Sequence, residues 1–366
     1  MSQSRREFLR TTALLGAGGA VLGDPFRILR MPPQERKLGF ALVGLGSLST
    51  NQISPALMKT KYCRLAGIVT GTPSKAVAWK AKYNIPDNAI YNYDTMSQLA
   101  SNPDIDVIYV VTPNALHAEH TNKALNAGKH VLCEKPMEIS VARCQSMVDT
   151  ARKAGKQLAI GYRCQFDPQH LAAVALAKER TFGSVKQIDA AFGFPAADPN
   201  QWRLNHVLSG GGPLMDVGIY ALQTSRMIAG REPIRVRAVE LPKTNPEKFK
   251  TVEEAMTFDV EFSGGLVAHC RTSYAEGMNQ FTITAEKGTF GMQPAYNYGG
   301  NKFNRSDNNI PAFGPTDVFQ AEMDDFAQRI ITKTPTKVPG EEGMRDVKYM
   351  MAIYEAARTG KPVNVG

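Results

Sequence analysis

An acid and a phenol lie four positions apart in one segment that follows a run of glycines. Asp216 and Tyr220 come after the glycines at positions 210–212, and Pro213 suits the first position of a helix. Residues four apart share a helix face, so Asp216 and Tyr220 could form a proton-transfer pair. The alternative is an acid stabilised by the helix dipole and a tyrosine in the core, and from spacing alone this alternative is the stronger one.

A second group of residues is suited to bind a dinucleotide phosphate. The apolar run Leu38–Val43 is typical of a buried parallel strand, and a Gly-Leu-Gly turn at 44–46 follows it, ahead of a helical stretch through Lys59. The first glycine permits the tight turn, and the second lets the backbone approach a pyrophosphate at the helix N-terminus. The third position is Ser49 instead of glycine or alanine, which is still small enough for close helix–strand packing.

The segment after the second predicted strand bears on which dinucleotide is bound. An NAD enzyme usually places Asp or Glu at this strand end, where the carboxylate binds the ribose 2′-hydroxyl. This chain has Thr70, Gly71 and Lys75 there and no carboxylate. Small hydroxyl donors and a lysine suit a 2′-phosphate, so the sequence favours NADP over NAD. The alternative is that Lys75 is only the solvated start of a helix that runs to Tyr83.

Alternating strands and helices around the glycine turn define the first half of the chain. Their spacing is typical of a doubly wound parallel α/β sheet. The predicted strands are 38–43, 64–69, 106–111, 130–133 and 158–162. Ligands of such sheets bind at the carboxyl ends of the strands, and Asn114, Lys135 and Arg163 all follow strand ends. We therefore predict an NADP-binding Rossmann domain over residues 38–163.

Beyond Arg163 the pattern changes to strands that alternate apolar and polar side chains. This alternation predicts an antiparallel sheet of five or six strands with one buried face. The predicted strands are 185–192, 234–240, 255–262, 266–274 and 281–285, with helices at 317–331 and 341–358. We therefore predict a second, α+β domain over residues 164–366.

The first residues carry an export pattern. Arg5 and Arg6, in the string Ser-Arg-Arg-Glu-Phe-Leu, precede a mildly apolar stretch at 11–22, which is the twin-arginine pattern. That stretch is too short to cross a hydrocarbon core of ~30 Å, so no stable membrane span is expected. We predict a twin-arginine signal over 1–23, a proline-containing arm over 24–37 and a periplasmic location, with a membrane anchor if the signal is retained. A disordered basic N-terminus is the alternative.

Composition and charge exclude several other classes of protein. The chain has 366 residues, 43% of them hydrophobic, as in soluble two-domain enzymes. The net charge of +9 forms no basic stripe, so nucleic-acid binding is not expected. Five spaced cysteines without a C-x-x-C pair indicate free thiols. His117 and His120 lack an evident third ligand, so no metal is expected, and His117 is placed near the cofactor instead.

Two longer strings carry a family resemblance. One covers residues 127–137 with Glu-Lys-Pro at 134–136, and the other covers 211–220 with the pattern Asp-x-Gly-x-Tyr. Both resemble the glucose–fructose oxidoreductase / inositol dehydrogenase / rhizopine catabolism (Gfo/Idh/MocA) family, and the glucose–fructose oxidoreductase branch above all. The resemblance extends from about Leu38 to the C-terminus. It implies a Rossmann domain followed by an open, mainly antiparallel sheet that covers the nicotinamide and often builds a homodimer or homotetramer.

The resemblance also implies roles for individual residues. Lys135 matches a lysine beside the nicotinamide and the sugar, and Asp216 and Tyr220 match the catalytic pair, with Tyr where most relatives have His. A tyrosine of ordinary pKa, ~10, is a poor base at neutral pH, so Lys135 is expected to lower the pKa of Tyr220. The residues predicted to bind the cofactor are Gly44, Leu45, Gly46, Ser47, Leu48, Thr70, Gly71, Lys75, Thr112, Pro113, Asn114, His117, Glu134, Lys135, Arg163, Trp202 and Arg203. Segments 194–201 and 296–316 are not mapped by the resemblance, and specificity would vary there.

The expected reaction is hydride transfer between sugars and a tightly bound NADP. Tyr220 takes a proton from an aldose, which becomes an aldonolactone, and a second sugar is then reduced to a polyol. Export favours this scheme, because the twin-arginine route moves folded proteins and no free NADP pool exists outside the cytoplasm. The alternatives are an ordinary sugar or inositol dehydrogenase, a redox-assisted glycosidase, and a non-catalytic sugar- or nucleotide-binding protein. The intact Lys135, Asp216 and Tyr220 argue against the last of these.

Overall fold

The structure is a computed structural model that describes residues 36–366. The predicted twin-arginine signal at 1–23 lies outside the described residues, as does the predicted arm at 24–37 except for its last two residues. Among the residues described, no helix combines the length and the apolar character that a membrane span requires.

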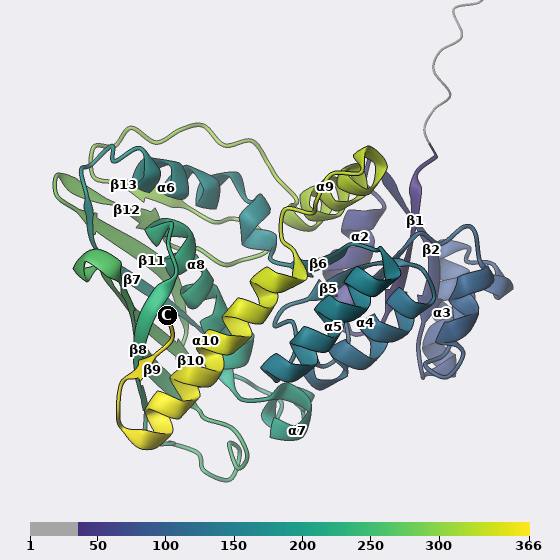
Figure 1. Ribbon diagram of the computed structural model, residues 1–366, viewed down its shortest axis with the longest axis horizontal. Coiled ribbons are helices and arrows are strands. Elements are labelled where there is room, and N and C mark those ends of the chain that lie inside the picture. The colour runs from purple at the N-terminus through teal and green to yellow at the C-terminus, as the bar shows by residue number, and fades with distance from the viewer. Residues whose placement is uncertain (1–35) are drawn as a thin grey trace, which may run out of the picture. The chain divides into compact units, whose positions relative to one another are not determined.

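The first half contains a six-stranded parallel sheet in the order β3-β2-β1-β4-β5-β6 (Figure 1), which confirms the predicted doubly wound sheet. Its strands are β1 Leu38–Val43, β2 Cys63–Val69, β3 Ile90–Tyr91, β4 Val107–Val110, β5 His130–Glu134 and β6 Leu158–Gly161. Its helices are α2 Ser54–Leu57, α3 Pro73–Tyr83, α4 His117–Asn126 and α5 Val141–Ala154. The strand order reverses beside β1, so the carboxyl ends of β1 and β4 flank the crevice where ligands of such sheets bind.

The sequence-based boundaries differ from the structure in a few places. Strand β3 is not among the five predicted strands, because two residues are too few to show a periodicity. The strands predicted at 106–111 and 158–162 are longer than β4 and β6. The helix expected to run through Lys59 ends at Leu57.

The turn after β1 has a backbone geometry that requires glycine. Gly44 has a φ of +91°, and a Cβ there would lie 2.7 Å from the carbonyl oxygen of Val111. The helix that follows opens with a π-helical turn, η1 (Ser49–Ile53), and continues as α2. Ser49 is fully buried, and its hydroxyl donates to the carbonyl of Gly44 at 2.6 Å. The serine at the third position therefore closes the turn.

The second half contains an eight-stranded sheet in the order β13-β12-β11-β7-β10-β9-β8-β14. Its strands are β7 Val185–Gly193, β8 Pro233–Glu240, β9 Ala255–Phe262, β10 Val267–Ser273, β11 Met278–Ala285, β12 Gly288–Met292, β13 Phe303–Arg305 and β14 Val363–Asn364. The sheet is mainly antiparallel, as expected, but β7 and β10 are parallel neighbours. The expected number of five or six strands is too small, because the sheet has eight. The helices between β7 and β8 provide part of the crossover that the parallel pair β7 and β10 needs. The strand number was underestimated because β12 to β14 are short.

One face of this sheet is buried, as the alternation predicts. Along β9, Met256, Phe258 and Val260 are buried, and the residues between them are partly exposed. Helices α8 (Ile219–Ala229) and α10 (Gly340–Thr359) pack against the strands of this sheet. Helix α8 therefore holds its second residue, Tyr220, beside the sheet.

Helix α9 (Val318–Thr332) belongs to the second half in sequence but packs with the first half, beside α2 (Figure 1). Phe319 and Phe326 belong to the same buried apolar cluster as Phe40 of β1. Residues 37–366 accordingly form one compact unit. The predicted domain boundary after residue 163 separates the two sheets but does not separate α9 from the first one.

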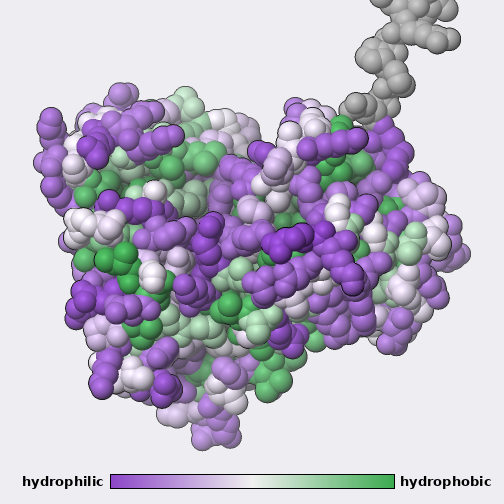
Figure 2. Space-filling model, in the orientation of Figure 1, coloured by the Kyte–Doolittle hydropathy of each residue, from purple (hydrophilic) through white to green (hydrophobic). Residues whose placement is uncertain are grey.

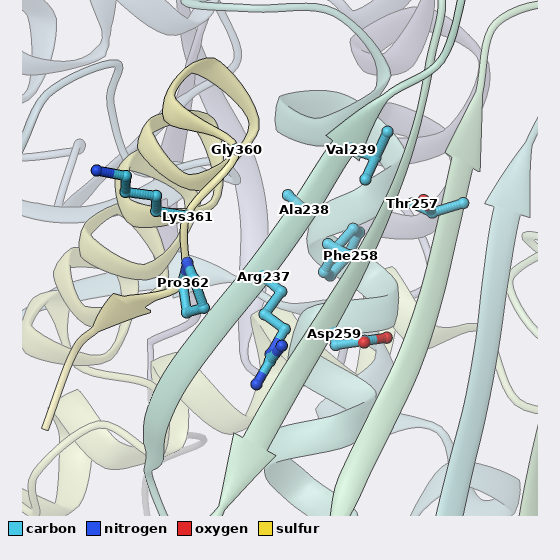
Figure 3. A pocket seen from close by; sticks show the side chains of 9 residues that line it. All are labelled: Arg237, Ala238, Val239, Thr257, Phe258, Asp259, Gly360, Lys361 and Pro362. Atoms are coloured by element: carbon cyan, nitrogen blue, oxygen red, sulfur yellow. The ribbon is translucent and has the colours of Figure 1, made fainter.

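A hollow of about 280 Å³ lies at strands β8 and β9 and the C-terminal turn (Figure 3). Arg237, Thr257, Asp259 and Lys361 are among its lining residues, and none of the predicted site residues is. The face in Figure 2 is largely hydrophilic, with hydrophobic areas that are separate from one another. This hollow is therefore not the predicted site, because the predicted residues line a different cavity.

The cysteines take no part in disulfides. All five are buried and free, which confirms the interpretation from their spacing. Burial raises the pKa of Cys270 to about 12, so it stays a thiol. Within residues 36–366, no group of three or more His, Cys, Asp or Glu side chains could hold a metal ion.

A buried ion cluster fixes α8 to α10. Arg226 of α8 is 6% exposed and contacts both oxygens of Glu232 at 2.9 Å. It also contacts Glu342 at 2.7 Å and Asp346 at 2.5 Å, and Asp346 is fully buried. Because Tyr220 lies on the same helix as Arg226, this cluster helps to set the position of Tyr220.

Replacing Arg226 with Met should lower the free energy of unfolding by about 3–5 kcal/mol, because the fully buried carboxyl group of Asp346 would lose the charged partner that opposes the cost of its burial. Chemical denaturation would show an earlier midpoint at an unchanged slope. Arg345→Met is the matched control on α10, since Arg345 is 45% exposed and its pair with Glu342 should contribute about 1 kcal/mol or less. A loss for Arg226→Met no larger than that of the control would show that the cluster does not hold the helices together.

Candidate active site

One cavity gathers nearly all the residues predicted for the cofactor and for catalysis. It has a volume of about 540 Å³ and extends from the turn after β1 to the start of α8. The predicted residues that line it are Gly44, Leu45, Gly46, Ser47, Leu48, Lys75, Thr112, Pro113, Asn114, His117, Glu134, Lys135, Arg163, Trp202, Arg203, Asp216 and Tyr220. Thr70 and Gly71 are the two predicted residues that do not line it.

The segment after β2 differs from the sequence-based prediction. Thr70 is 7% exposed, and its hydroxyl accepts the N–H of Thr72 at 3.2 Å, so it is used within its own turn. Gly71 lies against the ring of Tyr93, which would be 2.9 Å from a Cβ at that position. Tyr93 and Lys75 line the cavity here in place of the expected hydroxyl donor.

The end of the cavity at the glycine turn fits a dinucleotide phosphate. A Cβ at Gly46 would meet nothing within 4 Å, so the backbone borders open space there. Gly46, Ser47 and Leu48 line the cavity where the helix begins. The first N–H groups of a helix have no intrahelical partners and attract an anion. Together with the positive charge of Lys75, these residues suit a nicotinamide dinucleotide.

At the other end of the cavity, the carboxylate of Asp216 receives three side-chain donors. Arg203 Nε lies 3.0 Å and the Tyr274 hydroxyl 2.9 Å from Oδ2, and Lys135 Nζ lies 3.3 Å from Oδ1. Lys135 Nζ also donates to the main-chain oxygen of Asp216 at 2.6 Å. Burial by itself would raise the pKa of Asp216, but Arg203 and Lys135 outweigh burial and lower this pKa to about 2. Asp216 is therefore ionised at neutral pH and orients its three partners.

Asp216 lies in a π-helical turn, η7 (Leu214–Gly218), which follows Pro213 and continues into α8. Pro213 begins the helical segment, as predicted. Within residues 36–366, no hydrogen bond joins the side chains of Asp216 and Tyr220. The two residues line one cavity, but the expected direct proton-transfer pair is absent, because Asp216 is bound to its three donors.

The hydroxyl of Tyr220 is contacted by Arg163 and not by Lys135. Arg163 Nε donates to the Tyr220 oxygen at 3.1 Å, whereas Lys135 Nζ lies over the Tyr220 ring, 4.7 Å from its centroid. Burial raises the pKa of Tyr220, and the charge of Arg163 opposes this shift without cancelling it. The pKa of Tyr220 is thus raised, not lowered as expected, and the main charge that opposes burial is that of Arg163, whereas the ammonium group of Lys135 is bound to Asp216. Tyr220 is a neutral phenol at neutral pH.

Arg163 is a buried guanidinium group that is 4% exposed. Its two terminal nitrogens donate to the carbonyl oxygens of Tyr296 at 2.6 Å and Asn297 at 3.1 Å. In the described part of the chain, no carboxylate lies within ion-pair distance of Arg163. Its charge is instead compensated by these carbonyls and by the rings of Tyr220 and Tyr298, whose centroids both lie 4.9 Å away.

Behind Lys135, two buried carboxyl groups share one phenol. The Tyr109 hydroxyl lies 2.8 Å from Glu134 Oε1 and 3.3 Å from Glu322 Oε2. Burial raises the pKa of Glu322 well above its ordinary value, and the charge of Glu134 raises it further, so both favour the neutral form of Glu322. A protonated Glu322 can donate to Tyr109, and Tyr109 can donate to Glu134. Glu134 also accepts the N–H of Lys135 at 3.2 Å, which links this chain of hydrogen bonds to the cavity.

His117 lies at the cavity, as predicted, and connects two loops. Its Nδ1 is 2.9 Å from the carbonyl oxygen of Pro136, and its Nε2 is 2.8 Å from that of Thr112. Asn114 donates to the carbonyl oxygen of Ser209 at 2.8 Å. The loop after β4 is thus tied to the loop after β5 and to the glycine run before Asp216.

Six lining residues are not among those predicted. They are Tyr93, Val111, Asp198, Gln201, Tyr298 and Phe319. Asp198, Gln201 and Tyr298 belong to the two segments that the family resemblance does not map. Val111 follows β4 directly, so the rule of strand ends that indicated Asn114 could have found it. Tyr93 belongs to no motif and follows no predicted strand, so the sequence does not indicate that it lines the cavity.

Comparison with known proteins gives matches to both halves. Residues 38–162 match the GFO_IDH_MocA model, an oxidoreductase family with an NAD-binding Rossmann fold, and residues 170–291 match the GFO/IDH/MocA C-terminal domain. The NADP-dependent D-xylose 1-dehydrogenase of Haloarcula marismortui is 30% identical over 90% of this chain and 94% of its own.

Solved structures match over the same range. The aldose-aldose oxidoreductase of Caulobacter crescentus is 38% identical with a TM-score of 0.88, over 90% of this chain and 100% of that one. The scyllo-inositol dehydrogenase of Lactobacillus casei shares the fold, with a TM-score of 0.75 at 19% identity over 90% of this chain and 99% of that one. Because both halves match and the similarity extends through the cavity, the chain belongs to the GFO/IDH/MocA family of NAD(P)-dependent oxidoreductases.

Proposed function

We propose that the protein is an NADP-dependent sugar oxidoreductase with a tightly bound cofactor. It oxidises an aldose to its aldonolactone and then reduces a second sugar, a ketose or an aldose, to a polyol at the same cofactor. The presence of Lys135, Asp216 and Tyr220 in one cavity with the glycine turn carries this proposal. The similarity to an NADP-dependent D-xylose 1-dehydrogenase and to an aldose-aldose oxidoreductase supports a sugar as the substrate.

The chain's own residues supply the proton transfer and the orientation. A bound nicotinamide would supply hydride acceptance for the first sugar and hydride donation for the second. The phenolate of Tyr220, formed when the phenol gives its proton to solvent, accepts the proton of the anomeric hydroxyl in the oxidation. The phenol formed in this way donates a proton to the carbonyl oxygen in the reduction. Lys135, oriented by Asp216, donates a hydrogen bond to the same sugar oxygen. Arg163 stabilises the phenolate form of Tyr220 that the oxidation requires and that the reduction regenerates.

Support for NADP over NAD comes from the charges that follow β2. Lys75 lines the cavity, and the segment 70–75 contains no carboxylate. The carboxyl groups that line the cavity are those of Glu134, Asp198 and Asp216, which come from other segments. A lysine ammonium group binds a phosphate as a point charge.

We also propose that the protein is exported to the periplasm by the twin-arginine route with its cofactor already bound. The Ser-Arg-Arg string at 4–6 and the apolar stretch at 11–22 support this, although both lie outside the described residues. Outside the cytoplasm there is no pool of free NADP, so a retained cofactor that two sugars oxidise and reduce in turn would need no exchange.

A homodimer or homotetramer is the assembly that we propose. The partly exposed face of the eight-stranded sheet supports it, because a broad face without covering helices is available for a second copy. Thr257, Asp259 and Glu261 of β9 lie at the partly exposed positions of their strand.

The purified mature protein should carry a bound nicotinamide nucleotide. Adding an aldose should increase the absorbance of reduced nicotinamide by one equivalent per bound nucleotide, and adding a ketose after removal of the aldose should reverse the change. Reduction without reoxidation by any second sugar would instead indicate an ordinary aldose dehydrogenase. A protein that contains no nucleotide would contradict the retained cofactor.

Replacing Tyr220 with Phe should slow both half-reactions about 100-fold or more, because it removes the group that transfers the proton. The bound nucleotide should remain, and rapid-mixing absorbance would measure each half-reaction. Tyr349→Phe is the matched control, since the Tyr349 hydroxyl contacts Glu232 at 3.0 Å, away from the cavity lining. If Tyr220→Phe reacts at a rate close to that of the control, the proton passes through another group.

Replacing Lys75 with Ala should weaken NADP relative to NAD about tenfold, or about 1.4 kcal/mol, through loss of a charge-assisted phosphate contact. Chromatography of the nucleotides retained after reconstitution with both forms would measure this ratio. Lys80→Ala on the same helix is the control, since Lys80 pairs with Asp87 and does not line the cavity. An unchanged ratio would mean that Lys75 does not contact the 2′-phosphate.

A further inference from the structure

Tyr298 lies beside the catalytic groups and has no part in the chemistry described above. Its ring centroid is 4.9 Å from Cζ of Arg163 and 5.6 Å from the ring centroid of Phe319. Both of these neighbours are 4% exposed, whereas Tyr298 is 51% exposed. Since Tyr298 lines the cavity, its ring is presented to whatever occupies the catalytic end.

The hydroxyl of Tyr298 is an unused hydrogen-bonding group. The hydroxyl groups of Tyr109, Tyr220 and Tyr274 each lie within 3.1 Å of a polar atom of the protein. Within residues 36–366, the Tyr298 hydroxyl has no such partner. It is nevertheless close enough to Tyr220 and Lys135 to interact with their charges. A phenol can donate one hydrogen bond and also accept, so this group is free to bind a ligand hydroxyl there.

The backbone before Tyr298 is held by the same guanidinium that contacts Tyr220. Arg163 donates to the two carbonyl groups that precede Tyr298 in the chain and, through Nε, to the Tyr220 hydroxyl. One buried side chain therefore fixes the position of Tyr298 relative to the group that transfers the proton. A substrate-binding hydroxyl held in this way needs little ordering when the substrate arrives.

Tyr298 also separates the catalytic cavity from a neighbouring one. The neighbouring cavity has a volume of about 360 Å³, and its lining includes Asp167, Gln169, Asn301, Phe313 and Thr316. Tyr298 lines both cavities, Val318 lines the neighbouring one, and Phe319 lines the catalytic one. The ring of Tyr298 and the start of α9 thus form the partition between the two spaces.

We propose that Tyr298 determines which sugars the enzyme accepts. Its hydroxyl binds a hydroxyl group of the sugar, and its ring limits the catalytic end of the cavity to one sugar ring. This inference rests on the proposed sugar oxidoreductase function. A second sugar ring would have to extend past Tyr298 into the neighbouring cavity, whose lining includes the polar side chains of Asp167, Gln169 and Asn301 as well as Tyr298 itself.

Replacing Tyr298 with Phe keeps the ring and removes only the hydroxyl. Loss of one neutral hydrogen bond should raise KM for the aldose about three- to tenfold. The value of kcat should stay within about twofold, because this bond is equally present before and during hydride transfer. The amount of bound nucleotide should not change. An unchanged KM, or a loss of nucleotide with KM unchanged, would overturn a role in sugar binding.

Replacing Tyr298 with Ala removes the partition as well. The ratio of kcat/KM for a reducing disaccharide to kcat/KM for its component aldose should rise about tenfold, since one steric contact commonly accounts for a factor of this size. The Tyr298→Phe variant should keep the wild-type ratio. If Tyr298→Ala also keeps it, the ring is not what limits the size of the sugar.

The wild-type protein and Tyr349→Phe are assayed with the same sugars. If no aldose reduces the bound nucleotide of the wild type, the proposed function is overturned, and this inference with it. If the wild type reacts but Tyr298→Phe has the same KM and Tyr298→Ala the same sugar preference, only the role of Tyr298 is overturned. The two failures are therefore distinguishable.

Discussion

The ionised carboxylate of Asp216 joins the two halves of the molecule at the catalytic end of the cavity. Lys135 follows β5 of the parallel sheet, whereas Asp216 precedes α8 and Tyr274 follows β10, both in the second half. Burial favours the neutral acid, but Arg203 and Lys135 compensate for it, and the charge persists. The position of Lys135 therefore depends on a charge that the second half supplies, and neither half would hold this site alone.

Arg163 has the complementary role of a buried cation without a carboxylate partner in the described part of the chain. Its three nitrogens are all used, one on the Tyr220 hydroxyl and two on the carbonyls that precede Tyr298. Aromatic faces and carbonyl dipoles compensate such a charge only partly, so its field acts on the nearby phenol. A single side chain at the end of β6 thus both positions Tyr220 and influences its ionisation.

Local chemistry explains which parts of the site the sequence could predict. Gly44 needs a positive φ, and Lys135 and Asp216 lie in strings that resemble a family, so all three could be predicted as site residues, and all three line the cavity. The sequence could not show that the hydroxyl of Thr70 is used within its own turn. Nor could the sequence show that Tyr298 and Phe319 line the cavity. The loop of Tyr298 has no periodicity, and the apolar pattern of α9 predicts a helix without indicating that it packs with the other half.

The proposed cycle requires one phenol to give up a proton in the reduction and to take one up in the oxidation. Burial favours the neutral form of Tyr220, which is the form that the reduction consumes. Arg163 opposes burial and so lowers the free energy of the phenolate, which is the form that the oxidation needs. A fully compensated arginine would leave the phenolate too costly, and a much more acidic tyrosine would already be ionised and would have no proton to donate. Burial and one partly compensated guanidinium group have opposite effects on the pKa of Tyr220, and this opposition suits the tyrosine to proton transfer in both directions at a single site.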